Sequence, residues 1–590
     1  MKKILVGGLA FIGALVVLVI AIGVGGYQVA KKGVPDKTIL EVDLERGLIE
    51  YVPDGPLAGA LLAKKLTMRD VVEALARASQ DKRVVSLIAR VDAANLGLAQ
   101  IQEVRDAVLA FRKSGKPAVA HSETFGEFGP GNGAYYLATA FDEIYLQPSG
   151  DVGLTGLIAE SPFLRGTLEK LGVIARLDHR KEYKNAMNLF TERQYTEPHR
   201  EAVQKVVESQ FAQLLKGVAT ARKLSENEVR ALVDRGPFLG QQAVDTKLVD
   251  GLAYWDEVYA KAKEKAGEGV KRLPLSKYLQ RAGRAYEEGE TIALIYGVGG
   301  VHRGTSEYNP MFGSPSMGSD TVTAAFRSAV KDKDVKAILF RVDSPGGSYV
   351  ASDAIWREVV RAKAAGKPVV VSMGNVAGSG GYFVAMAADK IVAQPATITG
   401  SIGVLGGKML TSGFWDKIGL SWDEVHTSDN AAIWTSTRDY TPEQWAQFQG
   451  WLDRVYDDFT SKVAQGRGLP KEKVREVAKG RIWTGEDAKA LGLVDELGGF
   501  PAALRLAKEA AGIPEDAEIR LKLFPPKKTL VQTLMNRLLR EEKDNSEEEA
   551  ATVALAHALR VVQPLARVVR DLGLSPGSGV LAMPELEAIR

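Results

Sequence analysis

Ser379 has the sequence surroundings of a catalytic nucleophile. It lies between a strand-like run, PVVVSMG at residues 368–374, and a helix-like run, GYFVAMAAD at residues 381–389. A hydroxyl at such a junction meets the unpaired N–H groups of the first helical turn, and flanking glycines let the backbone turn tightly. This context predicts a serine that attacks a carbonyl. The alternative is a serine that only caps the helix.

A second glycine loop could complete the chemistry. Residues 343–348 (DSPGGS) follow another strand-like run. The backbone N–H groups of Gly346 and Gly347, together with that of Gly380, are candidates for an oxyanion hole, which stabilises the negative charge that develops during acyl transfer. The chain contains no cysteine, which excludes thiol nucleophiles and zinc ribbons, and we expect neither a metal nor a cofactor.

A serine nucleophile needs a base, and histidine is a poor candidate here. The chain has only six histidines, and those on either side of Ser379, His302 and His426, fit the role badly. Lysine can act instead when burial lowers its pKa toward neutrality. Our candidate is Lys184. Its neighbours at residues 180–182 are all charged, so local composition alone would also suit an exposed surface lysine.

The chain is a tandem repeat, and the repeat is what singles out Lys184. Three blocks recur in the same order, with offsets that drift from 251 to 245: residues 81–92 match 332–343, residues 131–148 match 378–395, and residues 240–250 match 485–495. At the position of Ser379 the first copy has Asn132, whose amide cannot attack a carbonyl. At the position of Lys184 the second copy has Asp429. Two incomplete sites therefore predict one site shared between the copies.

Each copy alternates strand-like and helix-like runs, which predicts an α/β fold with parallel strands and crossover helices. We expect a first repeat at residues 31–289 that supplies the lysine and a second at residues 290–520 that supplies the serine. A charged, helical extension is expected at residues 521–590.

The amino terminus predicts a membrane anchor at residues 1–30. Residues 4–26 are uncharged and apolar, long enough to cross a hydrocarbon core of about 30 Å. A cleaved signal peptide is the alternative. The net charge of +3, without a basic stripe, argues against binding to nucleic acid.

Four motifs resemble the signal peptide peptidase A (protease IV) family in its long, duplicated form: YKNA at residues 183–186, DSPGG at 343–347, GSGGY at 378–382 and TGSIG at 399–403. The resemblance implies a Clp/crotonase-like fold in both repeats and a Ser/Lys dyad, with Ser379 as nucleophile and Lys184 as general base. It also implies that the hydroxyl of Ser401 hydrogen-bonds the lysine. Gly378 departs from the alanine expected in many relatives.

The same resemblance implies substrates, assembly and location. Members degrade remnant signal peptides and other apolar peptides, assemble as homotetramers, and lie in the bacterial inner membrane with the catalytic part facing the periplasm. The resemblance extends to about Gly512. Whether the lysine and serine meet within one chain or between chains stays open.

Three other readings of the sequence stay open. An acyl-CoA enzyme of the crotonase type would need carboxylates near the glycine loops, where Asp343 and Asp389 lie, although Asp92 and Asp142 repeat them in the first copy. An α/β-hydrolase would need a downstream histidine and has no internal duplication. A membrane scaffold with inactive repeats would need no chemistry at all.

Overall fold

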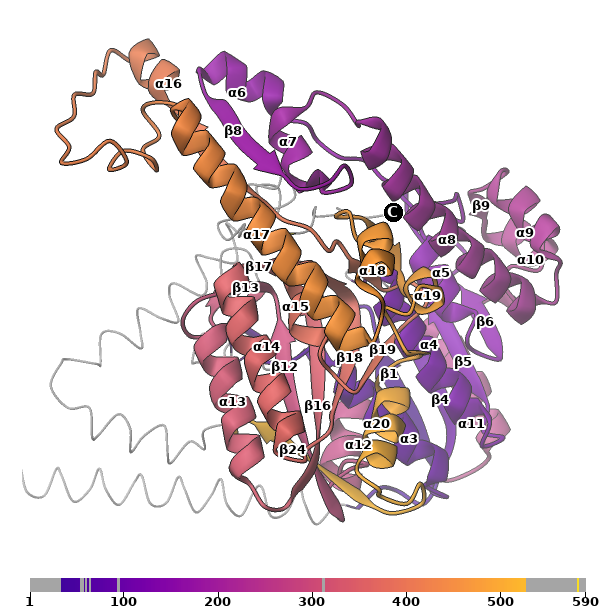
Figure 1. Ribbon diagram of the computed structural model, residues 1–590. Coiled ribbons are helices and arrows are strands. Elements are labelled where there is room, and N and C mark those ends of the chain that lie inside the picture. Colours follow the sequence, from indigo (N-terminus) through magenta and orange to yellow (C-terminus); the bar gives the residue numbers. More distant parts are fainter. Residues whose placement is uncertain are drawn as a thin grey trace, which may run out of the picture.

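The computed structural model describes residues 33–526 and 581–582, apart from 54–57, 59–60, 63–64, 93–95 and 310–313. The described chain is a mixed α/β protein (Figure 1). The expected anchor at residues 1–30 and most of the expected extension lie outside the described residues. Within the described ranges, none of the helices combines the length and apolarity needed to span a bilayer.

The first repeat is built on six parallel strands in the order β10-β6-β5-β4-β1-β11. Its central strands carry β-branched residues, such as VVSLIAR in β4, because such side chains pack well on a pleated surface. The strands are β1 (Thr38–Asp43), β4 (Val84–Arg90), β5 (Ala118–Ser122), β6 (Glu143–Leu146), β10 (Gly251–Leu252) and β11 (Lys271–Pro274). The main helices around them are α3 (Met68–Gln80), α4 (Leu98–Arg112), α5 (Asn132–Ala138), α11 (Trp255–Ala266) and α12 (Leu275–Ala282).

The second repeat has the same strand order. Its parallel strands run β23-β19-β18-β16-β12-β24, so that each has a counterpart in the first sheet. They are β12 (Glu290–Val298), β16 (Val335–Ser344), β18 (Val369–Gly378), β19 (Lys390–Ala393), β23 (Glu496–Leu497) and β24 (Ile519–Phe524). The main helices are α13 (Ser319–Lys331), α14 (Tyr349–Ala364), α15 (Gly380–Ala385), α19 (Gly485–Ala490) and α20 (Phe500–Ala510). The predicted parallel α/β architecture is therefore present in both halves of the chain.

The carboxy-terminal boundary differs from the prediction. The expected limit at residue 520 falls inside β24, which pairs with β12 in register from Glu290↔Ile519 to Ile295↔Phe524. The second sheet thus extends four residues into the segment expected to be a helical extension. Within that segment Leu581–Ala582 forms a strand, β25, instead of a helix. It pairs antiparallel with β17 (Gly346–Gly347), at the end of a small sheet. The other strands of that sheet are β13 (Gly300–His302), β14 (Tyr308–Asn309) and β15 (Ser314–Gly318).

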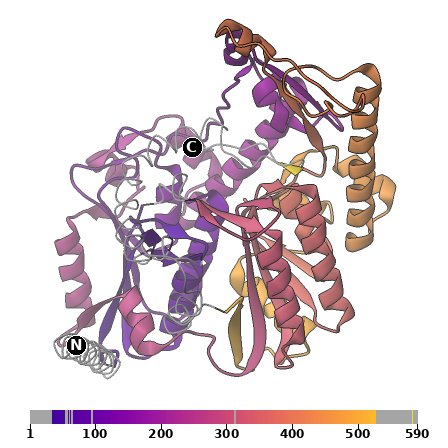
Figure 2. The same cartoon turned by 90° about the vertical axis from the view of Figure 1, so that its left-hand side faces the viewer.

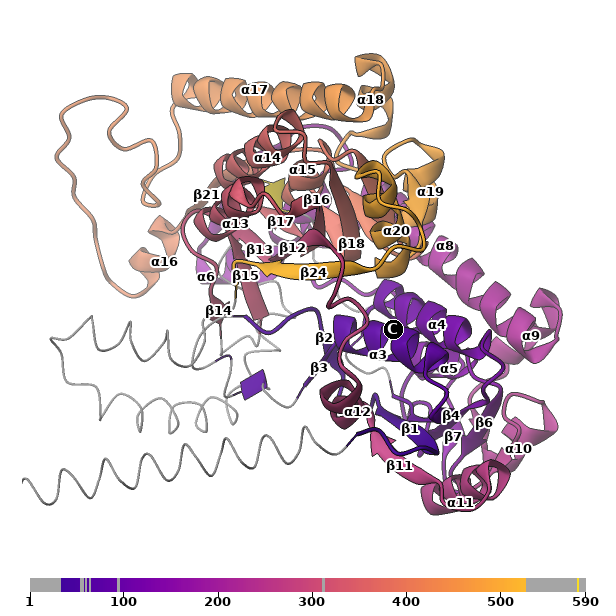
Figure 3. The same ribbon diagram turned by 90° about the horizontal axis from the view of Figure 1, so that it is seen from below.

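The two repeats lie side by side (Figures 2 and 3), and elements of each contact the other at their boundary. β8 (Ile174–His179) of the first repeat pairs antiparallel with β21 (Leu405–Leu410) of the second. Two long helices, α8 (Glu197–Arg222) and α17 (Pro442–Arg467), occupy corresponding places in the two copies, with 26 residues each. α8 contacts β22 (Ile482–Thr484) across the boundary, where Ala202 and Val206 pack against Ile482.

A buried ion cluster also joins the repeats. Arg341 on β16 donates to the carboxylates of Glu50 and Glu103 from the first repeat, with closest N···O distances of 2.9 Å and 2.7 Å. All three side chains are at most 4% exposed. Removing one partner of such a cluster leaves an uncompensated buried charge, so we expect its loss to weaken the contact between the repeats.

Candidate active site

Ser379 connects β18 to α15 in an unusual backbone conformation. Its φ of 53° and ψ of −114° lie outside the regions that non-glycine residues normally adopt, which costs about 1–3 kcal/mol. Its N–H donates to the carbonyl of Gly400 over 2.8 Å, and its own carbonyl accepts from Phe383 N–H over 2.8 Å. The Ser379 side chain makes no capping hydrogen bond to α15, so the interpretation that it only caps the helix is wrong.

Lys184 and Ser379 meet, although 195 positions separate them in the chain. Lys184 Nζ lies 2.8 Å from Ser379 Oγ, within hydrogen-bonding distance. It donates to Ser401, over 3.0 Å to Oγ and 3.1 Å to the carbonyl oxygen. All three residues are 0% exposed, so the interpretation of Lys184 as a surface lysine is wrong. The structure thus brings together Ser379, Lys184 and Ser401 within one chain.

The pairing of β8 with β21 brings the lysine to the serine. In this ladder His179 faces Leu405, and Arg180 N–H extends it with a hydrogen bond to the carbonyl of Val404 over 2.9 Å. Lys184 follows His179 in the chain and Ser401 precedes Leu405, so both strands approach the same point from opposite repeats.

Burial sets the charge of the lysine. Desolvation lowers the pKa of Lys184 well below its ordinary value, because an apolar interior disfavours the ammonium form. A neutral amine keeps two hydrogens to donate and one lone pair that can accept a proton. Ser401 offers a carbonyl oxygen and a hydroxyl as acceptors for those hydrogens.

Two glycines make room for Lys184. A Cβ placed on Gly480 would lie 2.6 Å from the backbone nitrogen and Cα of Lys184, and one on Gly403 would lie 3.1 Å from its Cδ. Gly480 belongs to a turn of the second repeat that also holds the neighbouring backbone, since Tyr183 N–H donates to the carbonyl of Lys479 over 3.1 Å. Sequence reasoning missed the role of both glycines. Gly403 ends the TGSIG motif at residues 399–403, but the motif did not connect it with Lys184, and nothing in the local sequence of Gly480 separates it from an ordinary turn glycine.

Gly480→Ala is expected to lower peptidase activity by about 100-fold, the usual cost of displacing a catalytic group by about 1 Å. The added methyl group would push the Lys184 backbone away from Ser379. The matched control is Gly366→Ala, at a glycine whose φ of +76° is close to the +79° of Gly480 but whose Cβ would meet nothing within 4 Å. Rates of peptide cleavage and thermal melting curves would be compared. Equal losses of activity in the two variants would contradict a specific role of Gly480.

The candidate oxyanion glycines lie together but are not equivalent. A Cβ on Gly380 would fall 3.0 Å from the amide nitrogen of Gly347 and 3.1 Å from Cα of Gly346, so the two loops are in contact. The N–H of Gly346 donates to Ser344 Oγ over 3.2 Å. Gly347 and Gly380 are therefore better placed than Gly346 to donate to a substrate.

The first repeat uses the matching position differently. Asn132 is buried, and its Oδ1 accepts from the N–H groups of Thr155 and Gly156, both over 3.1 Å. Its Nδ2 donates to the carbonyl of Gly156 over 2.8 Å. The amide thus ties a loop together where the second repeat has its serine.

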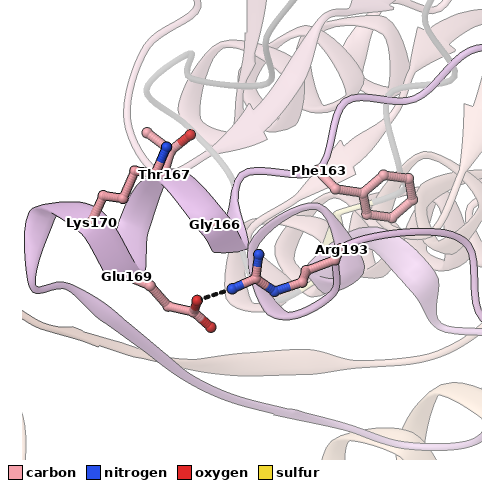
Figure 4. Close-up of a pocket in the computed structure, with 6 residues that line it drawn as sticks. All are labelled: Phe163, Gly166, Thr167, Glu169, Lys170 and Arg193. Carbon is pink, nitrogen blue, oxygen red and sulfur yellow. Dashed lines mark hydrogen bonds and ion pairs between the residues drawn. The ribbon is translucent and has the colours of Figure 1, made fainter.

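A pocket of about 510 Å³ lies on the first repeat, apart from the Lys184–Ser379 contact network (Figure 4). An ion pair between Arg193 and Glu169 crosses it. None of the residues predicted from the sequence as site residues lines this pocket, which is formed by Phe163, Gly166, Thr167, Glu169, Lys170 and Arg193.

Comparison with known families identifies the chain. A model described as "Peptidase family S49" matches residues 110–269 and 361–514, one segment in each repeat. The chain belongs to peptidase family S49. This S49 chain is 35% identical over 461 residues to Protease 4 of Salmonella typhi, covering 76% of this chain and 72% of that protein. It is 32% identical over 464 residues to the chloroplastic serine protease SPPA of Arabidopsis thaliana, covering 77% and 67%.

Membership of family S49 makes the protein a serine protease, as the motifs predicted. The crotonase, α/β-hydrolase and inactive-scaffold interpretations are thereby set aside. Among solved structures, ClpP1 of Listeria monocytogenes is 13% identical, with a TM-score of 0.22 over 36% of this chain and 94% of that chain. The architecture established here is mixed α/β, and the Clp/crotonase-like assignment stays a prediction.

Proposed function

We propose that this S49 peptidase is a membrane-anchored endopeptidase that uses Ser379 as nucleophile and Lys184 as general base. The observation that carries the proposal is the 2.8 Å contact between Lys184 Nζ and Ser379 Oγ in a fully buried site. A serine and a base within hydrogen-bonding distance, with the base oriented by a third group, is the usual arrangement for covalent catalysis. Here Ser401 is the orienting group.

The proposed reaction begins with a neutral Lys184. Its two hydrogens are donated to Ser401, and its lone pair accepts the proton of Ser379 as Oγ attacks the substrate carbonyl. The resulting ammonium then donates this proton to the leaving amine as the peptide C–N bond breaks, which leaves an acyl-enzyme. The same amine then takes a proton from water as the water oxygen attacks the ester, and the ammonium gives this proton to Oγ as the acid leaves, which restores Ser379 and the neutral lysine.

Backbone N–H groups stabilise the oxyanion in this proposal. Gly380, the first residue of α15, has an N–H without a partner in its own helix, and it adjoins Gly347. One such donor contributes about 3 kcal/mol to the transition state.

The proposed substrates are extended, apolar peptides, including signal peptides left after cleavage. A peptide bound along β17 would run next to Ser379 and satisfy its backbone through strand pairing. Support comes from β25, an extended segment whose Leu581–Ala582 pairs antiparallel with Gly346–Gly347; a substrate peptide would pair there in place of β25.

The remaining parts of the proposal come from sequence. The apolar residues 4–26 would anchor the protein in the bacterial inner membrane and keep the catalytic part, facing the periplasm, near its substrates. The resemblance to long signal peptide peptidases favours two Clp/crotonase-like repeats and a homotetramer.

A comparison of two peptides tests the proposal. The full chain in detergent micelles should hydrolyse an apolar, leader-like peptide at least about tenfold faster than a peptide of the same length with charged residues at alternate positions, because the charges must be desolvated on binding. Both peptides would be followed by mass spectrometry, with Ser379→Ala protein as the control for contaminating proteases. Equal rates of hydrolysis for the two peptides would contradict the proposed preference for apolar substrates.

A further inference from the structure

β18, the strand that leads to Ser379, contains a bulge shortly before its end. β16 and β18 pair in step from Ile338↔Val369 to Val342↔Met373, and the next pair is Ser344↔Ala377. Between these pairs β18 advances four residues while β16 advances two. Such a bulge bends a strand and redirects the residues that follow it.

Side chains from neighbouring segments hold the backbone of this bulge. Asp343 Oδ1 accepts a hydrogen bond from Val376 N–H over 2.9 Å, and Thr397 Oγ1 donates to the carbonyl of Gly374 over 2.9 Å. The fit is close, because a Cβ on Gly374 would lie 2.8 Å from Cβ of Asp343.

Asn375, in the middle of the bulge, reaches the first repeat. Its Oδ1 accepts from Ala99 N–H in the first turn of α4, over 3.3 Å. A Cβ on Gly97 would lie 1.9 Å from that same oxygen, so a glycine is required for Asn375 to dock. α4 also carries Glu103, which binds Arg341, so one helix of the first repeat contacts both β16 and β18.

The first repeat also acts on Asp343 through charge. Arg341, two residues earlier on β16, is held by Glu50 of the first repeat. Desolvation, and after it the negative charge of Glu50, raises the pKa of Asp343 to about 7. The carboxyl that holds Val376 is therefore sensitive to how the two repeats meet.

We propose that Asp343 and Asn375 are positioning residues that hold the bulge of β18 and thereby present Ser379 in its strained conformation, with the first repeat supporting the nucleophile as well as supplying the base. A residue at φ 53° stays there only when its surroundings hold it in several places. Downstream, the Gly400 carbonyl and α15 hold Ser379; upstream, the bulge does. This inference rests on the proposed role of Ser379.

The test measures the reactivity of Ser379 and the turnover of peptide in the full chain. Asp343→Ala and Asn375→Ala should each lower kcat by at least about tenfold, since small displacements of a reacting group are costly, while KM stays within about twofold. Labelling of Ser379 by a fluorophosphonate probe should slow by the same factor as kcat. Asp343→Asn keeps an oxygen that accepts from Val376 N–H, and it should restore kcat to within about threefold of wild type.

The matched control is Asp92→Ala, at the corresponding position of the first repeat, which should leave both rates within about twofold of wild type. Circular dichroism and thermal melting identify any variant that fails to fold, in which case the other alanine variant decides. If folded Asp343→Ala and Asn375→Ala proteins were labelled by the fluorophosphonate at the wild-type rate while Ser379→Ala stayed inactive, the positioning role would be overturned and the proposed function would remain intact. Activity in Ser379→Ala would overturn both.

Discussion

Ser379→Ala should abolish peptide hydrolysis, with kcat falling at least about 1,000-fold, because loss of the nucleophile from a serine protease removes most of its catalysis. Folding should be preserved, since the hydroxyl contacts Lys184 and makes no capping bond to α15. The measurements are hydrolysis of an apolar peptide and covalent labelling by a fluorophosphonate, compared at equal protein concentration.

Ser225→Ala is the matched control for this change. Ser225 does cap a helix, since its Oγ accepts from Glu228 N–H over 3.2 Å at the start of α9 (Glu226–Val233). Its loss should cost about 1 kcal/mol of stability and no activity. If Ser379→Ala behaved in the same way, or kept a tenth of wild-type activity, Ser379 would not be the nucleophile.

Lys184→Met should lower kcat at least about 100-fold, the usual contribution of a positioned general base. Methionine fills a similar volume but cannot accept the proton of Ser379. Lys184→Arg should fail as well, because a guanidinium does not give up its proton at usable pH. Wild-type activity should rise with pH as Lys184 becomes neutral, since burial places its pKa well below the ordinary value.

Stability gives an independent check on the charge of Lys184. Because its pKa is lowered on folding, the unfolded chain binds more protons between the folded and unfolded pKa values. The contribution of Lys184 to the free energy of unfolding therefore increases as pH rises through that window and decreases as pH falls. Lys184→Met removes this titrating group, so the melting temperature of the variant should depend less steeply on pH than that of wild type.

Activity supplies the contradicting outcome for the role of Lys184 as base. A flat activity profile from about pH 5 to 9, or an active arginine variant, would exclude the lysine as base.

Because the contact forms within one chain, a mixture of Lys184→Met and Ser379→Ala proteins should stay inactive. This outcome is a control for the two changes above. Recovery of activity would mean that the dyad assembles between chains.

The sequence was sufficient to predict which residues meet, because aligning the two copies shows which reactive side chain each copy has lost. The first copy has Asn132 in place of the serine, and the second has Asp429 in place of the lysine. This comparison pairs Ser379 with Lys184 without knowledge of the fold. Ser401 came from the family resemblance instead. The strand pattern of both sheets was also predictable, since buried parallel strands such as β4 and β16 are runs of β-branched and aliphatic residues.

What could not be predicted depends on contacts between segments far apart in the chain. The sequence of β21 is LGGKML, and its two glycines disfavour the prediction of a strand. The strand forms because β8 pairs with it. The close approach of Gly480 to Lys184 and the docking of Asn375 beside Gly97 need the repeats to be in place.

The separation of 195 positions between Lys184 and Ser379 has a consequence during synthesis. A ribosome adds about 5–20 residues per second, so the serine is made about 10–40 s after the lysine. The turn at Gly480, which encloses the lysine, emerges later still. A nascent chain that has folded only its first repeat lacks Ser379, so under the proposed mechanism it cannot yet cut itself or its neighbours. Proteolytic competence is thus among the last properties that the growing polypeptide acquires.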